Sequence, residues 1–172
     1  MTGSRESFRA LKDLQQPSVL ATVVGGDRLG ARWLVDEAAQ EFPAGVRRVQ
    51  ATGEASLVPD ESGSGPAEAL LEPITPGRLA PWIHFCSQQL ERGKRCALAT
   101  VVAIEGEAMP YALGDRFAYD DHSHHGLLPI DAGLSVALTR ATARALTSGT
   151  AFRERFTVPG GTLDLVVEPL EP

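Results

Sequence analysis

The chain has 172 residues, of which 43% are hydrophobic and 22% are charged, so it is long and apolar enough to fold around a buried core. Its net charge is −6, and residues 1–78 and residues 79–172 each contain 8 Lys/Arg and 11 Asp/Glu, so neither half is basic. This even, acidic balance argues against a nucleic-acid partner, because phosphate backbones are bound by clustered positive charge.

The first predicted element is an amphipathic helix over residues 4–16, which ends before Pro17. A Leu-Ala-Thr-Val-Val strand follows at residues 20–24, and its apolar residues at every position indicate a central strand covered on both faces. Gly30 then provides a turn before a strand over residues 31–35. A short helical segment is expected over residues 36–42, and further strands over residues 46–52, 55–58 and 70–73.

The same order returns in the rest of the chain. The Leu-Ala-Thr-Val-Val segment recurs 78 residues later at 98–102, the Leu-Gly-x-Arg segment at 29–32 recurs at 113–116, and the Glu-Pro that closes 70–73 recurs in 166–169. Order is kept while the spacing grows, which indicates a duplicated unit whose second copy has longer connections. We therefore predict two related halves, residues 1–77 and 78–172, either as separate units or as one compact domain.

The second copy is predicted to be the fuller one. A helix over residues 81–93 starts at Pro81 and stops at Gly93, and strands follow over residues 98–102 and 116–119. A long helix over residues 132–147 would be capped by Asp131 and ended by Gly149, before a last strand over residues 162–167. Helices mixed with strands in this way predict an α/β or α+β fold with a mixed β-sheet and flanking helices.

Residues 82–172 closely, and residues 8–76 more loosely, resemble the N-terminal domain of the XdhC/CoxI family. The resemblance rests on residues 92–102, 114–116 and 160–170. Members of that family are maturation factors of molybdenum hydroxylases such as xanthine and carbon monoxide dehydrogenases. They are thought to bind the molybdenum cofactor, protect it and deliver it to the apo-hydroxylase.

The resemblance implies a cofactor-binding loop in the second copy. The family's Gly-Ser-x-Pro-Arg-x-x-Gly run corresponds to residues 106–114, where the Pro and both Gly are kept and the Ser and Arg are not. The candidate molybdopterin-binding residues are Gly106, Pro110, Gly114, Arg116 and Gly126. The family's Ser-Gly-Gly-Cys run is replaced by residues 129–133, which contain no cysteine, and Asp131 there would occupy the N–H groups that an anion needs.

Two further candidates have a functional and a structural interpretation, and both stay open. His122, His124 and His125, three of the four histidines, stand beside Asp120 and Asp121 and could hold zinc or nickel; the same residue types are at home at a polar hairpin tip. Arg32 and Arg116 occupy equivalent positions in the two copies, where each could contact an anion or be a solvated strand residue or part of an ion pair.

The sequence shows no Ser-His-Asp order, phosphate-binding loop with Lys-Ser or Lys-Thr, or Cys-x-x-Cys pair, so we expect a protein that is not an enzyme. The predicted function is that of an accessory, chaperone-like protein that assists the handling of molybdenum cofactor by binding the cofactor, a molybdenum hydroxylase or other maturation proteins. The alternative is a structural or protein-interaction module without a ligand. A homodimer, in which copies pair across chains, stays open.

We expect a cytoplasmic protein with no membrane partner. Residues 1–14 contain no apolar core of signal-peptide length, and no apolar stretch approaches the roughly 20 residues that a membrane span needs. Cys86 and Cys96 are too few for a disulfide framework and are expected to be buried thiols.

Overall fold

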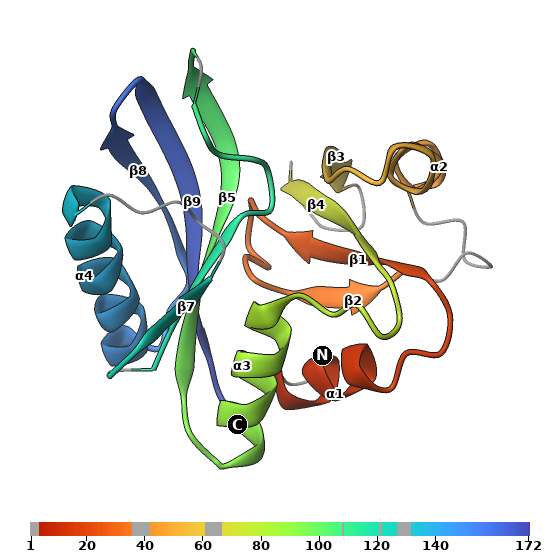
Figure 1. Cartoon of the computed structure of the whole chain (residues 1–172), viewed down its shortest axis with the longest axis horizontal. Coiled ribbons are helices and arrows are strands. Elements are labelled where there is room, and N and C mark those ends of the chain that lie inside the picture. The colour runs from red at the N-terminus through yellow and green to blue at the C-terminus, as the bar shows by residue number, and fades with distance from the viewer. Residues whose placement is uncertain (1–3, 36–41, 61–66, 108, 121, 127–131) are drawn as a thin grey trace. The chain divides into compact units, whose positions relative to one another are not determined.

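The structure is a computed structural model that describes residues 4–35, 42–60, 67–107, 109–120, 122–126 and 132–172 (Figure 1). The chain divides into two units. We call Ala10–Leu79 the small unit, and Met1–Arg9 together with Ala80–Pro172 the large unit. The division after Leu79 lies two residues from the predicted boundary, but the chain's first nine residues belong with the second half.

The small unit is a four-stranded antiparallel sheet in the order β2-β1-β4-β3. Its strands are β1 (Ser18–Val23), β2 (Arg32–Leu34), β3 (Ser56–Asp60) and β4 (Ala67–Ile74). Helix α2 (Pro43–Thr52) packs on one face, where Val46 and Val49 meet an apolar cluster that includes Ala21 and Leu71. The small unit therefore has its own core on the face that α2 covers.

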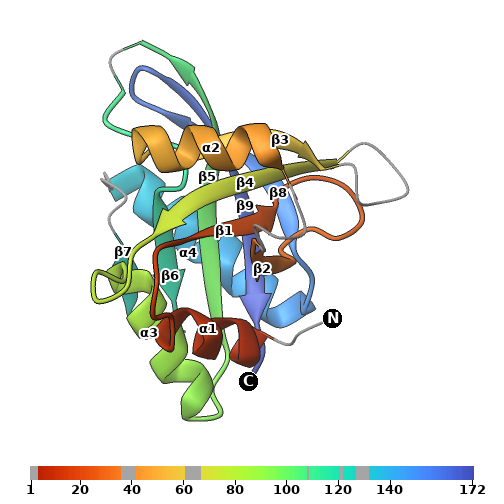
Figure 2. The same ribbon diagram turned by 90° about the vertical axis from the view of Figure 1, so that its right-hand side faces the viewer.

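The large unit is a five-stranded antiparallel sheet in the order β7-β6-β5-β9-β8. Its elements are α1 (Ser4–Lys12, through Arg9), α3 (Pro81–Glu91), β5 (Cys96–Gly106), β6 (Arg116–Tyr119), β7 (His124–Gly126), α4 (Ala132–Ser148), β8 (Phe152–Val158) and β9 (Gly161–Leu170). Helix α4 lies along one face of this sheet (Figures 1 and 2).

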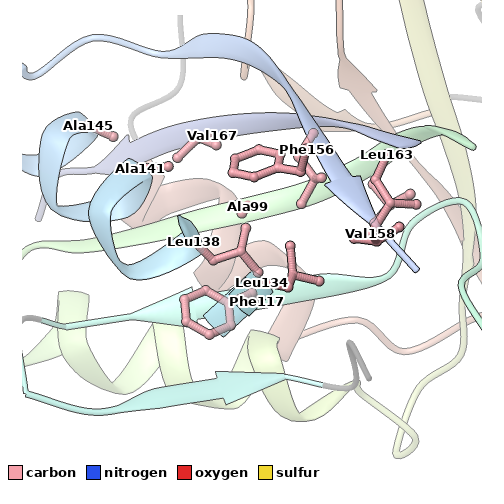
Figure 3. Close-up of a cluster of buried hydrophobic side chains, with 12 residues drawn as sticks. Ala99, Phe117, Leu134, Leu138, Ala141, Ala145, Phe156, Val158, Leu163 and Val167 are labelled. Carbon is pink, nitrogen blue, oxygen red and sulfur yellow. The ribbon is translucent and has the colours of Figure 1, made fainter. Parts of the chain in front are cut away.

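Under α4, the core of the large unit is formed by side chains from the helix and from β5, β6, β8 and β9. Figure 3 shows Leu134 and Leu138 of α4 beside Phe117 of the sheet, and Ala141 of α4 beside Val167. The apolar residues recur along α4 at the three- and four-residue spacing of one helix face, which explains why this helix was predictable. Among the described residues, no helix is both long and apolar enough to cross a bilayer.

The two sheets repeat one another residue by residue. Ala21 stands opposite Trp33 and Leu71 in the small unit, and Ala99 stands opposite Phe117 and Val167 in the large unit. One residue further on, Thr22 faces Arg32 and Thr100 faces Arg116. The predicted duplication and the central position of the Leu-Ala-Thr-Val-Val strands are therefore confirmed, as is the expected class of helices flanking β-sheet.

The structure corrects several details. The described strands form two sheets whose pairings are all antiparallel, in place of one mixed sheet, because hairpins join β1 to β2, β3 to β4 and β8 to β9. Residues 46–52, predicted as a strand, belong to α2, which starts at Pro43 and ends at Gly53 in the left-handed conformation. The strand β8 was missed, and the first helix ends at Lys12. The helix expected over residues 36–42 lies outside the described residues, apart from Phe42.

Other predicted boundaries hold. Helix α3 begins at Pro81, and at its end the N–H groups of Gly93 and Lys94 donate to the carbonyls of Leu90 and Gln89, a Gly-centred C-cap. Helix α4 is followed by Gly149, whose N–H donates to the Ala145 carbonyl at 2.9 Å. Both cysteines are buried free thiols, as expected. The predicted cap Asp131 lies outside the described residues.

Candidate functional site

The loop between β5 and β6, which contains most of the candidate residues, closes in the same way as its counterpart between β1 and β2. Gly114 N–H donates to Val101 O at 2.9 Å, and Gly30 N–H donates to Val23 O at the same distance. Both glycines have positive φ, 86° and 85°, which explains why glycine stands at this position in both copies. The loop of the large unit is six residues longer, since Val23 to Gly30 spans seven positions and Val101 to Gly114 thirteen.

Arg116 lies beneath the end of this loop and is only 3% exposed. Its Nη1 donates to the carbonyl of Gly114 at 3.0 Å, and its guanidinium lies over the Trp82 ring of α3, 4.1 Å from the ring centroid. Trp82 in turn packs edge-on against Phe8 at 5.8 Å. The interpretation of Arg116 as a solvated strand residue is therefore wrong, because the side chain is buried and ties the loop to α3. Its equivalent Arg32 is also buried, at 9% exposure.

Asp115 stabilises the turn from inside. Its Oδ2 accepts a hydrogen bond from Ala112 N–H at 2.8 Å. Partial burial raises the pKa of Asp115 above its ordinary value, although the Ala112 hydrogen bond and the charge of Arg116 oppose that rise. A carboxylate at this position places negative charge next to the guanidinium of Arg116.

The remaining candidate glycines and proline are placed apart from Gly114. Gly106 ends β5 opposite Gly161, roughly 15 Å further along the strand than Val101 at about 3.3 Å per residue. A Cβ on Gly106 would clash with Gly160 O, so this glycine permits the close approach of the β8–β9 turn to the end of β5. Pro110 is exposed in the loop, and Gly126 ends β7 opposite Phe117. The structure thus brings Gly114 and Arg116 together and leaves Gly106 at the distant end of β5.

The histidine-rich segment contains a compact turn organised by Asp120. Its Oδ1 accepts hydrogen bonds from His122 N–H at 3.1 Å and from Ser123 N–H at 2.8 Å, while its Oδ2 accepts one from Gln89 Nε2 at 3.0 Å. Burial would raise the pKa of Asp120, but the hydrogen bonds from Ser123 and His122 outweigh burial and lower it. Asp120 therefore serves the turn, as the polar-hairpin interpretation expects.

The metal prediction itself stays a prediction. His122 is exposed, and the ring of His125 stacks on Phe85 at 4.3 Å. Within the described residues, no three His, Cys, Asp or Glu side chains gather as metal ligands, and Asp121 and the side chain of His124 lie outside that description. Metal analysis of untagged protein against the His122→Ala/His124→Ala variant would test it.

The described loop fits an anionic dithiolene cofactor poorly. The N–H groups of Ala112, Gly114 and Asp115 are all engaged, by Asp115 Oδ2, Val101 O and Ala112 O. An anion at this turn would need those donors, because backbone N–H groups and an accessible cation are what bind phosphate. No thiol lies in the loop, since Cys86 is in α3 and Cys96 starts β5.

Sequence reasoning missed Trp82 as part of this arrangement. It was predicted only as an apolar helix residue, and no local pattern links it to Arg116. The available signal was that an aromatic residue stands in the helix that precedes each Leu-Ala-Thr-Val-Val strand, Phe8 in the first copy and Trp82 in the second. The structure places these two rings against each other within the large unit.

Comparison with known proteins adds a likeness of fold. No family model matches the sequence, and no curated protein matches it. Among solved structures, the chain is similar to a xanthine dehydrogenase from Bacillus halodurans, with a TM-score of 0.57 and 18% sequence identity. The similarity covers 81% of this chain and 45% of that one, so the chain spans less than half the length of the protein it matches.

Proposed function

We propose that this chain is a non-enzymatic accessory protein for a molybdenum hydroxylase and that it acts by binding a partner protein. Two lines support the proposal. The segments at residues 92–102, 114–116 and 160–170 resemble the XdhC/CoxI maturation factors, and the fold is similar over 81% of the chain to a structure described as a xanthine dehydrogenase.

We favour partner binding over cofactor binding because the backbone N–H groups of the β5–β6 loop already donate hydrogen bonds within the protein. Three of its N–H groups have intramolecular acceptors, and its cation is 3% exposed and stacked on Trp82. A turn so satisfied presents a fixed shape, which suits recognition by another protein better than it suits capture of a phosphate. Met109, Pro110 and Tyr111 lie on the part of the loop that the first copy lacks, and they are its candidate contact residues.

The test is co-purification of the full chain with the molybdenum hydroxylase of the same cell, with pterin fluorescence measured on the purified protein. We expect a complex that the Pro110→Ala/Tyr111→Ala variant weakens, and no pterin bound to the free chain. The matched control is Leu29→Ala in the shorter loop of the small unit, which should leave the complex unchanged. Failure to bind the hydroxylase would overturn the proposal. Pterin on the free chain would overturn the partner-only mode and favour cofactor handling.

The second candidate is an interaction module with no link to molybdenum enzymes. The same satisfied loop favours it, since every loop contact described serves the fold. The two candidates differ in which protein is captured: binding of the hydroxylase supports the first, and its absence alongside a stable complex with a copy of this chain supports the second.

A further inference from the structure

A small pocket lies between α1 and α3 within the large unit, away from the β5–β6 loop. Its volume is about 100 Å³, and it is lined by Arg5, Phe8, Arg9, Ser87, Leu90 and Glu91. The two helices lie next to each other, with their axes crossing, in both views (Figures 1 and 2). About 10–15 Å³ of such volume holds one water, so the pocket has room for a group as large as a phosphate or a carboxylate.

Three of the residues that line the pocket, Phe8, Leu90 and Ser87, are buried. Phe8 is 0% exposed and packs edge-on against Trp82, and Leu90 is 1% exposed. Ser87 also lines the pocket and is 3% exposed. A buried hydroxyl at a pocket surface is a donor already in place for a bound oxygen.

The rim carries two cations on one helix. Arg5 and Arg9 are four residues apart in α1, so their side chains leave the same face. Both are exposed, and neither forms an ion pair with another described residue. Although the chain has a net charge of −6, two guanidinium groups and only one carboxylate, that of Glu91, are among the residues that line this pocket.

We propose that this pocket binds a phosphate-sized oxyanion, held by Arg5 and Arg9 and by the hydroxyl of Ser87. A guanidinium can donate two parallel hydrogen bonds to such a group, so two of them and one hydroxyl satisfy most of its oxygens. The carboxylate of Glu91 at the rim opposes a second negative charge, so the site favours a singly charged oxyanion over a doubly charged one. This inference goes beyond the proposed function and shares no residue with it.

The test is titration of the full chain with inorganic phosphate, followed by calorimetry and by backbone NMR shifts. We expect saturable binding that moves residues of α1 and α3, weakened at least tenfold in the Arg5→Gln/Arg9→Gln variant. Arg47→Gln/Arg48→Gln is the matched control, because it removes the same charge from the exposed face of α2 and should bind as the parent does. Ser87→Ala should weaken binding several-fold, and Glu91→Gln should tighten it.

Titration with two further ligands distinguishes which class of molecule carries the bound oxyanion. Glycerol 2-phosphate binding as tightly as phosphate would indicate a phosphate ester, and acetate binding more tightly than either would indicate a carboxylate-bearing ligand, both within the proposal. Absence of saturable binding by all three, or equal loss in the two double-arginine variants, would overturn it. Since hydroxylase capture does not use this pocket, each proposal can fail without the other.

Discussion

The two copies of the duplicated unit keep the same central frame and differ in what is attached to it. Around Gly30 and Gly114 the same three backbone hydrogen bonds recur, and the strands pair in the same register. The large unit adds six residues to the loop before Gly114 and an additional edge strand, β7. Its helix α4 has 17 residues, whereas helix α2 of the small unit has 10. The frame thus specifies the fold, and the additions are where the copies could acquire separate roles.

The equivalent aromatic residues Phe117 and Trp33 give the largest expected contrast. Phe117 is 0% exposed in the core under α4, so Phe117→Ala should lower the free energy of unfolding by about 3–5 kcal/mol. Trp33 is only half-buried, and Trp33→Ala should cost roughly half as much. Urea denaturation measures both; equal costs would show that the two cores are more alike than their burial indicates.

The stacked arginines give the next contrast. Arg116→Lys keeps the charge but loses the planar stack on Trp82 and the bond to Gly114, and should cost about 1–3 kcal/mol. Arg28 lies 5.8 Å from the Trp33 centroid and is exposed, so Arg28→Lys should cost less than about 1 kcal/mol. Thermal and urea unfolding measure both costs. If Arg116→Lys leaves the free energy of unfolding unchanged, the stack of Arg116 on Trp82 does not stabilise the loop.

Glycine substitutions test the close approach of the β8–β9 turn to Gly106 at the end of β5. Gly106→Ala places a methyl group 2.2 Å from a backbone oxygen at φ 144°, and should cost roughly 1–3 kcal/mol. Gly53→Ala meets nothing within 4 Å, so only its positive φ of 69° opposes it, at about 1 kcal/mol. If both variants unfold at the same urea concentration, the backbone of Gly160 does not lie close enough to Gly106 to exclude a methyl group.

The smallest expected effect comes from the charged part of the large sheet. The hydrogen bond from Arg155 lowers the pKa of Asp164 below its usual value of 3.8, so the ion pair stabilises the fold above that pH and is lost as pH falls through the lowered pKa. Asp164→Asn should therefore cost less than about 1 kcal/mol at neutral pH, and nothing in acid. Unfolding free energies measured across pH 2–7 would check it; a cost that persists in acid would contradict the ion-pair explanation.

Sequence predicted the frame well and the contacts between its parts poorly. Helix α4 was recovered because apolar residues recur at helical spacing, and the glycine turns because both copies carry them. The sequence predicts a strand in place of most of helix α2, because Val46 and Val49 are β-branched. Their three-residue spacing is nevertheless helical. Strand β8 was missed because charged residues, Arg153, Glu154 and Arg155, fill its centre.

For the candidate site, the Arg116 position was found by the repeat, but its partner was not. Trp82 and Arg116 are far apart in sequence, so only folding brings them together. The hydrogen-bond partners of the loop N–H groups were equally hidden, because glycine and proline spacing predicts a turn and says nothing of which donors stay available.

The position of Phe8 has a consequence for how the protein is made. Since the ring lies on Trp82 within a unit that otherwise starts at Ala80, helix α1 is synthesised before the residues that it packs against. During synthesis, Phe8 therefore lacks its contact with Trp82 until Ala80–Pro172 has been made. Expression of Ala80–Pro172 alone would therefore expose the surface of Trp82 that Phe8 covers.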